Sequence, residues 1–296
     1  MTTAIVWGEL LWDRFPDGAR LGGAPANVAW HLAQLGTAVA LVTRVGDDAD
    51  GHAAIAALAA RGVDTRFVQI DDERATGEVE VTVVDGEPRY RLVPGRAWER
   101  IALTDDVRAA LTSARALVFG TLAQRGDDGH AGLAAALAAA SPRVLRVCDP
   151  NLRGAVAGDG ERRALAQALA AADVVKVGER EVAQIAARTG EADVVGGLLA
   201  RGARLVAVTA GSAGSRWVAP GFAGMDVAAR PARPGGDNVG CGDAYTAALV
   251  HGLLAGWPWP RIGRLAARLG AEVASARGAT PAIDPPAIAA MIAEAT

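Results

Sequence analysis

The sequence predicts a single α/β domain over residues 1–296, with a doubly wound, mostly parallel sheet and helices on both of its faces. Apolar residues make up 51% of the chain and charged residues 21%, which is the composition of a globular protein. Short apolar runs rich in β-branched residues alternate with Ala- and Leu-rich segments of helical periodicity. This alternation favours a parallel sheet, because parallel strands need long crossover connections that are usually helices.

The strands are expected where the apolar runs are nearly continuous, since strands covered on both faces need no polar side. The strand candidates lie at 4–7, 38–43, 116–119, 144–148, 174–177 and 205–209. The helix candidates lie near 26–35, 49–60, 131–140, 161–171, 180–187, 243–254 and 260–276.

Residues 76–95 break this pattern. The segments TGEVEVTVV (76–84) and PRYRLV (88–93) flank Asp85-Gly86 and alternate between apolar and polar residues, which is typical of a β-hairpin with one solvated face. A hairpin does not fit inside a parallel sheet, so we expect a small β-lid built from about 9–20 and 76–95. Pairing of its exposed edge with that of a second copy would give a homodimer.

Charge and hydropathy exclude several classes of partner. The formal net charge of −3 lacks the basic excess that nucleic-acid binding needs. No apolar stretch approaches the roughly 18 residues of a membrane span, and the N-terminus lacks the basic region of an export signal. With only Cys148 and Cys241 a disulfide framework is not expected, and we expect a cytoplasmic protein.

The segment GGDNVGCGDAYTAALV (235–250) carries the most chemical information. Its small residues Gly240, Cys241 and Gly242 precede an apolar helix that is expected to begin near Asp243. The start of a helix attracts anions through its unpaired N–H groups, and small residues let an anion come close. Asp243 is then either an N-cap of its own helix or a general base beside a transferring phosphoryl group.

Several motifs in collinear order resemble the ribokinase-like (PfkB) carbohydrate kinases along nearly the whole chain. DNVGCGD (237–243) resembles the family signature DTxGAGD, and Gly22, Gly23 and Asn27 match its Gly-Gly-x-x-x-Asn element. The remaining matches are TRVGDDADG (43–51), DPNLR (149–153), KVGERE (176–181) and VTAGSAGS (208–215). Three segments are most similar to those of bacterial fructokinases: the opening GELLWD…GGAPANVA (8–29), AWERI (97–101) and FGTLAQR (119–125).

The resemblance implies catalytic and acceptor-binding residues. Asp243 would be the general base, and the backbone amides around Gly240, Cys241 and Gly242 would form an anion hole. The residues implied to bind the sugar are Asp13, Gly22, Gly23, Asn27, Gln124, Arg125 and Arg153. Taken alone, Asp13 and Arg153 would be ordinary surface residues.

The resemblance also implies an ATP site. Its residues would be Lys176, Glu181, Thr209, Gly211, Gly214, Gly240 and Gly242. Glu181 would act on Mg²⁺ through water, and Asp237 with Asn238 would hold a monovalent cation such as K⁺. Lys176 is the only lysine among 30 basic residues, which makes a specific role for a compact ammonium group more plausible.

The implied reaction is ATP-dependent phosphorylation of a small sugar, with D-fructose converted to fructose 6-phosphate. The alternatives are 2-keto-3-deoxygluconate, ribose or a nucleoside as acceptor, or a catalytically silent, sugar-binding regulatory protein. The chain departs from the family pattern at Cys241, Asn238 and Gly178, where the family has Ala, Thr and Asn. The glycine at 178 removes a polar side chain near the expected metal and keeps the silent alternative open.

Overall fold

The computed structural model describes residues 3–84, 87–152 and 158–295, and within them a nine-stranded sheet is the largest element. Its strand order is β13-β12-β11-β10-β9-β8-β1-β4-β5, and all neighbours are parallel except the pairs β11–β12 and β12–β13. The strands are β1 (Ala4–Trp7), β4 (Val39–Gly46), β5 (Val68–Asp71), β8 (Ala116–Phe119), β9 (Leu145–Cys148), β10 (Val174–Gly178), β11 (Leu205–Thr209), β12 (Ser215–Ala219) and β13 (Phe222–Val227).

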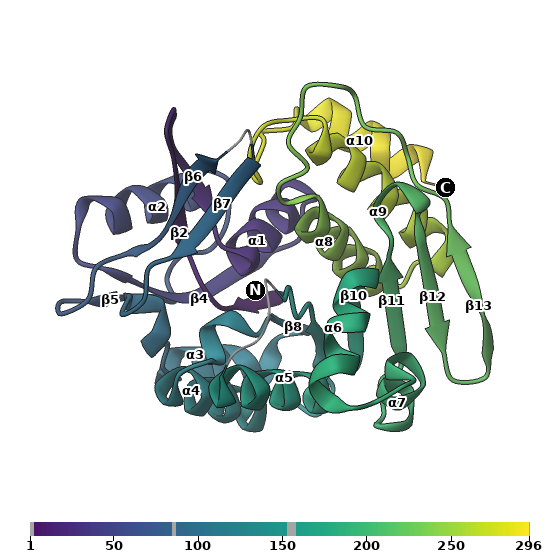
Figure 1. Ribbon diagram of the computed structural model, residues 1–296, viewed down its shortest axis with the longest axis horizontal. Coiled ribbons are helices and arrows are strands. Elements are labelled where there is room, and N and C mark those ends of the chain that lie inside the picture. The colour runs from purple at the N-terminus through teal and green to yellow at the C-terminus, as the bar shows by residue number, and fades with distance from the viewer. Residues whose placement is uncertain (1–2, 85–86, 153–157, 296) are drawn as a thin grey trace.

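Helices cover both faces of this sheet, as expected for a doubly wound fold (Figure 1). One face packs against α1 (Ala24–Gln34), α2 (Ala49–Ala59), α8 (Cys241–Leu254), α9 (Trp259–Ala274) and α10 (Pro285–Glu294). The other packs against α3 (Asp105–Ser113), α4 (Asp127–Ala139), α5 (Asp159–Ala171), α6 (Glu179–Thr189) and α7 (Val194–Ala200). All four residues of β1 are apolar because both faces of the strand are covered. Ala4 and Val6 pack into the core on the α1 and α8 face, and Ile5 and Trp7 pack into the core on the opposite face.

A second sheet of four strands in the order β3-β2-β6-β7 lies beside the main one (Figure 1). Its strands are β2 (Leu11–Phe15), β3 (Gly18–Gly22), β6 (Gly77–Val84) and β7 (Glu87–Leu92). The predicted hairpin is confirmed, since β6 and β7 pair antiparallel, while its Asp85-Gly86 turn lies outside the described residues. The segment predicted at 9–20 supplies β2 and most of β3, which continues to Gly22.

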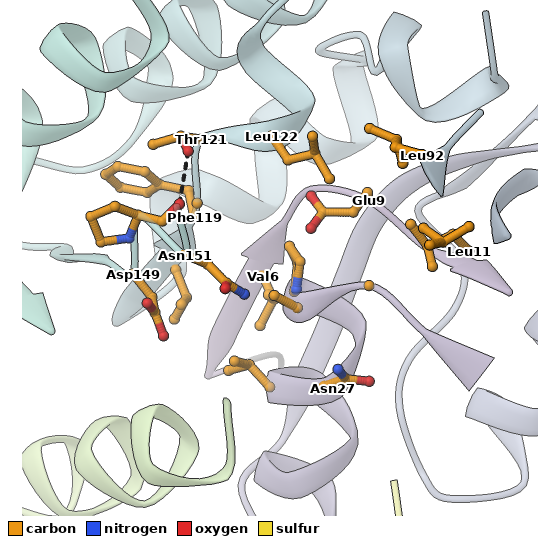
Figure 2. Close-up of a pocket in the computed structure, with 18 of the residues that line it drawn as sticks. Val6, Glu9, Leu11, Asn27, Leu92, Phe119, Thr121, Leu122, Asp149 and Asn151 are labelled. Atoms are coloured by element: carbon orange, nitrogen blue, oxygen red, sulfur yellow. Dashed lines mark hydrogen bonds between the residues drawn. The ribbon is translucent and has the colours of Figure 1, made fainter. Parts of the chain in front are cut away.

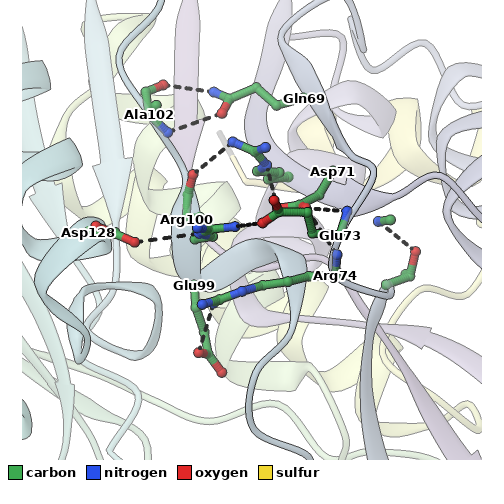
Figure 3. A network of polar contacts seen from close by, with 11 residues as sticks. Gln69, Asp71, Glu73, Arg74, Glu99, Arg100, Ala102 and Asp128 are labelled. Carbon is green, nitrogen blue, oxygen red and sulfur yellow. Dashed lines mark hydrogen bonds and ion pairs between the residues drawn. The ribbon is translucent and has the colours of Figure 1, made fainter.

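The connection between the two sheets is fixed by a polar network (Figure 3). The carboxylate of Asp71, at the end of β5, accepts hydrogen bonds from the backbone amides of Glu73 and Arg74, both at 3.0 Å. It also forms an ion pair with Arg44 at 2.8 Å. Arg100, in the short 3₁₀ helix η1 (Ala97–Arg100), bonds to Glu73 at 2.7 Å. These contacts hold the start of the second sheet against the main domain.

Among the described residues, no helix combines the length and apolar character that a membrane crossing requires.

Candidate active site

The loop before α8 is shaped by Gly240. This residue is the N-cap of α8 and has a left-handed backbone with φ of 75°; a Cβ there would lie 2.5 Å from the Cβ of Ala279. Only glycine fits this combination of backbone conformation and close approach. The helix begins at Cys241, earlier than the predicted start near Asp243. The reading of Asp243 as an N-cap is therefore wrong, because Asp243 lies inside the first helical turn.

Asp243 is held by a residue from the other end of the chain. Asn27, in the first half of α1, donates a hydrogen bond from Nδ2 to Oδ2 of Asp243 at 2.8 Å. Both residues are buried, with exposed fractions of 4% for Asn27 and 5% for Asp243. Oδ1 of Asn27 is buried and has no hydrogen-bond partner among the described residues.

A first cavity of about 420 Å³ lies next to this pair, between the second sheet and the carboxyl ends of β1, β8 and β9 (Figure 2). Open α/β sheets bind ligands at this edge. Its polar lining residues are Glu9, Asp13, Asn27, Thr121, Arg125, Asp149 and Asn151. Leu11, Val79 and Leu92 of the second sheet supply part of its apolar wall. The cavity thus combines hydrogen-bonding groups with apolar surface, as a site for a small polyol requires.

Most of the predicted acceptor residues come together at this cavity. Asp13, Gly23, Asn27 and Arg125 line it. Gly22 faces Asp13, since a Cβ at this glycine would lie 2.5 Å from Oδ2 of Asp13.

Three predicted acceptor residues need comment. Gln124 is 1% exposed and is not part of the lining, so the structure places its side chain inside the protein rather than in the cavity. Arg125 lines the cavity but also forms an ion pair with Glu161 at 2.8 Å. Arg153 lies outside the described residues.

A second cavity of about 660 Å³ lies on the other side of the same loop. Thr209, Gly211 and Gly214 line it, as expected for the nucleotide side, together with Cys241 and Gly242. Small residues of α9 complete one wall, namely Ala267, Gly270, Ala271 and Ala274.

The segment 238–243 separates the two cavities. Val239 faces the first cavity, whereas Asn238, Cys241 and Gly242 face the second. Asp243 lines neither cavity, and its link to the first is the hydrogen bond from Asn27, which lines it. A phosphoryl group entering from the second cavity would therefore meet the N-terminus of α8 beside a carboxylate, which is the arrangement that in-line transfer to an alcohol needs.

Lys176 occupies a buried position behind this loop. Its Nζ lies 3.1 Å from Oδ2 of Asp149, and 3.0 Å from the place that a Cβ on Gly242 would take. Burial opposes the charged ammonium, but the charges of Asp149 and Glu181 outweigh this effect and raise the pKa of Lys176. Lys176 lines neither cavity, so the structure does not place it where the predicted direct contact with ATP would occur.

Glu181 is fixed by the backbone rather than by side chains. Its Oε1 accepts a hydrogen bond from the amide of Leu152 and its Oε2 one from the amide of Gly178, both at 2.6 Å. Burial and the charge of Asp149 raise the pKa of Glu181, which Lys176 and the two amide bonds partly offset. The glycine that departs from the family pattern still supports this carboxylate through its backbone amide, and a Cβ at Gly178 would crowd Oε2 at 3.0 Å.

Among the described residues no group of three possible metal ligands occurs, and Glu181 lines neither cavity, so a divalent cation here would be held through water. Each carboxylate oxygen of Glu181 keeps acceptor capacity beyond its amide bond, and a nearby cation would stabilise the charged form that burial disfavours. Mg²⁺ keeps most of its water shell in proteins, so a carboxylate of this kind suits contact through water.

The two residues predicted for a monovalent cation are placed differently. Asp237 accepts hydrogen bonds from the backbone amides of Val239 at 3.1 Å and Gly278 at 2.8 Å, so it ties two loops together. Asn238, with φ of 58°, lines the second cavity. The oxygens of Asp237 retain lone pairs that an alkali cation can use.

Two residues that touch this site were missed in the sequence. Asp149, within the DPNLR motif, lines the first cavity and pairs with Lys176, yet the motif suggested only Arg153 as a ligand-binding residue. Thr246, one turn beyond Asp243, donates a hydrogen bond to Asp149 at 2.7 Å. The helical spacing of Asp243 and Thr246 was the available signal, because residues three apart share a helix face.

The chain is similar to known carbohydrate kinases along most of its length. The model of the pfkB family carbohydrate kinases matches residues 18–285. A fructokinase of Klebsiella pneumoniae is 33% identical over 264 residues, which cover 84% of this chain and 84% of that protein. A fructokinase of Escherichia coli is 31% identical over 303 residues, which cover 95% of this chain and 96% of that protein.

Solved structures extend the similarity to the whole fold. An uncharacterized sugar kinase from Pyrococcus horikoshii in complex with ATP matches with a TM-score of 0.85 and 26% identity, over 99% of this chain and 100% of that one. A fructokinase from Vibrio cholerae with bound fructose, ADP and calcium ion matches with a TM-score of 0.82 and 25% identity, over 99% of each chain.

Proposed function

The chain belongs to the pfkB family of carbohydrate kinases, and we propose that it transfers the terminal phosphoryl group of ATP to the primary hydroxyl of D-fructose, giving fructose 6-phosphate and ADP. The observation that carries this proposal is the position of Asp243, buried at the loop between two cavities and bonded to Asn27 in the wall of the first. The fructokinases among its relatives support fructose as the acceptor.

In this proposal the first cavity holds the sugar. Asp13 and Asn27 bind its hydroxyls, with Gly22 and Gly23 giving close approach of the backbone. Arg125, which lines the same cavity, and Arg153 are the further proposed sugar-binding residues. The buried position of Gln124 favours a supporting role in place of the expected sugar contact. The apolar side chains of the second sheet cover the sugar as a lid and exclude water, which would otherwise accept the phosphoryl group.

The reaction follows from the placement of Asp243. Its carboxylate takes the proton of the sugar hydroxyl while the oxygen forms a bond to the γ-phosphorus, and the bond from phosphorus to the departing ADP oxygen breaks. The backbone amides at Gly240, Cys241 and Gly242 stabilise the negative charge of the transferring group. We expect removal of this carboxylate to lower kcat strongly and the free energy of unfolding only slightly, because Asp243 is not the N-cap of α8.

The second cavity holds ATP in this proposal, with Thr209, Gly211 and Gly214 along the nucleotide. Glu181 holds Mg²⁺ through water, and the ion neutralises phosphate charge when bound. Asp237 and Asn238 hold K⁺ at the neighbouring loop. We further propose that the 296-residue chain acts as one domain in the cytoplasm and forms a homodimer through the edges of its lid sheets.

The test is ADP release coupled to a spectroscopic readout, measured with fructose, 2-keto-3-deoxygluconate, ribose and a nucleoside in parallel. We expect the highest kcat/KM with fructose and a dependence on Mg²⁺ and K⁺. A higher kcat/KM with another acceptor would overturn the assignment to fructose. Binding of a sugar without ATP turnover would support the silent regulatory alternative. Light scattering that gives the mass of one chain would overturn the dimer.

A further inference from the structure

Asp149 joins three elements at one buried carboxylate. It directly follows β9, and its Oδ2 accepts a hydrogen bond from Oγ1 of Thr246 in α8 at 2.7 Å. Nζ of Lys176 in β10 lies 3.1 Å from Oδ2 and 3.4 Å from Oδ1. All three side chains are buried. Asp149 therefore connects three elements: the end of β9, the middle of β10 and the first turns of α8.

The start of α8 depends on such contacts. Its N-cap Gly240 has no side chain to close the first turn. Thr246 lies three residues after Asp243 and so occupies the same side of the helix. Lys176 lies against the same turn, since its Nζ is 3.0 Å from where a Cβ on Gly242 would be. Thr246 is bonded within that turn, because its Oγ1 also donates to the carbonyl of Gly242 at 3.1 Å. Both partners of Asp149 thus lie at the turn that carries Asp243.

On its other side, Asp149 belongs to the wall of the first cavity. Figure 2 shows it beside Phe119 and Asn151, across the cavity from Leu11 and Leu92. The following residue, Pro150, is anchored in turn, because Thr121 donates a hydrogen bond from Oγ1 to its carbonyl at 2.7 Å. One carboxylate therefore connects the surface that would hold the sugar with the helix that carries the base.

From this connection we propose that Asp149 is a positioning residue for phosphoryl transfer: through Thr246 and Lys176 it fixes the first turn of α8, and with it Asp243, relative to the sugar in the first cavity. This inference rests on the proposed function. A displacement of about 1 Å in a reacting group can cost about 100-fold in rate, so we expect loosening of this contact to slow the chemical step more than it weakens substrate binding.

Stability alone does not account for the arrangement. Buried ion pairs can often be replaced by apolar residues of similar volume without loss of stability, so a core contact does not require charge here. A purely structural role also predicts no change in turnover when one bond to the network is removed and the fold is kept.

The experiment changes Thr246, which the proposed mechanism does not place in contact with substrate. Thr246→Val removes the hydroxyl and keeps the shape of the side chain, whereas Thr246→Ser keeps the hydroxyl. Thr189→Val is a control for the loss of a threonine-to-carbonyl bond within a helix. Thr189 in α6, which is exposed where Thr246 is buried, donates to the carbonyl of Ile185 at 2.9 Å, as Thr246 does to that of Gly242 at 3.1 Å. Steady-state kinetics and single-turnover rapid quench are measured with fructose and ATP after thermal unfolding confirms that each variant is folded.

We expect Thr246→Val to lower kcat and the single-turnover rate by about 10- to 100-fold, with KM for both substrates within about threefold of the original values. Thr246→Ser and Thr189→Val should retain kcat within about twofold. An unchanged single-turnover rate in folded Thr246→Val would overturn the inference, and so would a loss confined to KM. An original chain that phosphorylates no sugar would instead overturn the proposed function.

Discussion

The amide of Asn27 and the carboxylate of Asp243 meet at 2.8 Å although 216 residues separate them in the sequence. They meet because α1 and α8 pack side by side on the same face of the sheet. Nδ2 of Asn27 faces Asp243, its Oδ1 is buried without a partner among the described residues, and the residue lines the first cavity. A hydroxyl bound beside Asn27 would therefore lie near the carboxylate that is proposed to deprotonate it.

Asp243→Asn should separate the catalytic role of the carboxylate from a structural one. The amide has the same shape and its oxygen can still accept the bond from Asn27. We expect kcat to fall by roughly 10²- to 10⁴-fold, the usual contribution of a general base. The free energy of unfolding should stay within about 1 kcal/mol, because Gly240 rather than Asp243 caps α8. Steady-state kinetics measure the loss of kcat, and denaturant unfolding measures the free energy of unfolding. A kcat equal to that of the original chain would contradict the mechanism.

Gly240→Ala should displace the loop between the cavities. A Cβ at this position would lie 2.5 Å from Ala279, and the left-handed backbone itself costs roughly 1–2 kcal/mol for a residue with a Cβ. Gly256→Ala is the control, because Gly256 has a similar φ of 68° and no atom within 4 Å of the added carbon. We expect Gly256→Ala to lower stability alone, and Gly240→Ala to lower stability further and to abolish most turnover. Equal effects of the two changes on kcat would contradict the role given to the loop.

Lys176→Met should destabilise the fold strongly. It leaves the carboxylate of Asp149 buried without its counter-charge, which typically costs about 3–5 kcal/mol. Adding Asp149→Leu removes that charge as well, so the double variant should recover at least about 2 kcal/mol of the loss. Thr246 keeps a hydrogen bond to the carbonyl of Gly242 in the double variant. Chemical denaturation of the original chain, Lys176→Met, Asp149→Leu and the double variant measures the coupling, and additive losses would show that the pair is not the cause.

His31 should make stability depend on pH. Its side chain is fully buried and bonded to the carbonyl of Ala279 at 2.8 Å, and burial lowers its pKa to about 4. In the unfolded chain the pKa returns to about 6.5, so between these values the unfolded state binds more protons. Stability is then lost as the pH falls from about 6.5 to 4, by about 3 kcal/mol in total. His31→Gln cannot titrate, and the difference in pH dependence between the two proteins isolates this effect; parallel profiles would contradict it.

Much of the main sheet could be predicted because its strands are covered on both faces. The runs at Ala4–Trp7, Ala116–Phe119 and Leu205–Thr209 are apolar except for the terminal Thr209, and the structure has strands with the predicted bounds. The antiparallel strands β12 and β13 were missed because polar residues such as Arg216 and Asp226 interrupt them. The Pro220-Gly221 dipeptide between them, with φ of 69° at the glycine, was the turn signal that could have revealed the pair.

Site residues that lie in one short motif could be predicted, whereas those brought together from distant segments were harder to predict. The glycines around Asp243 predict an anion-binding turn within a single motif. Gln124 and Arg125 are neighbours, but η2 (Leu122–Gln124) turns one into the protein and leaves the other at the cavity, which sequence spacing does not reveal. The meeting of Asp149 with Thr246 spans 97 residues and depends on the order of strands in the sheet.

The second sheet contributes Leu11, Asp13, Val79 and Leu92 to the first cavity, whereas the residues that line the second cavity come from the main domain. Changes at those four residues, which lie on β2, β6 and β7, can therefore alter which alcohol is accepted while leaving the second cavity and Asp243 unchanged. Substitutions in the second sheet can thus change acceptor specificity while the main domain is kept, and engineering of a new acceptor specificity should begin in that sheet.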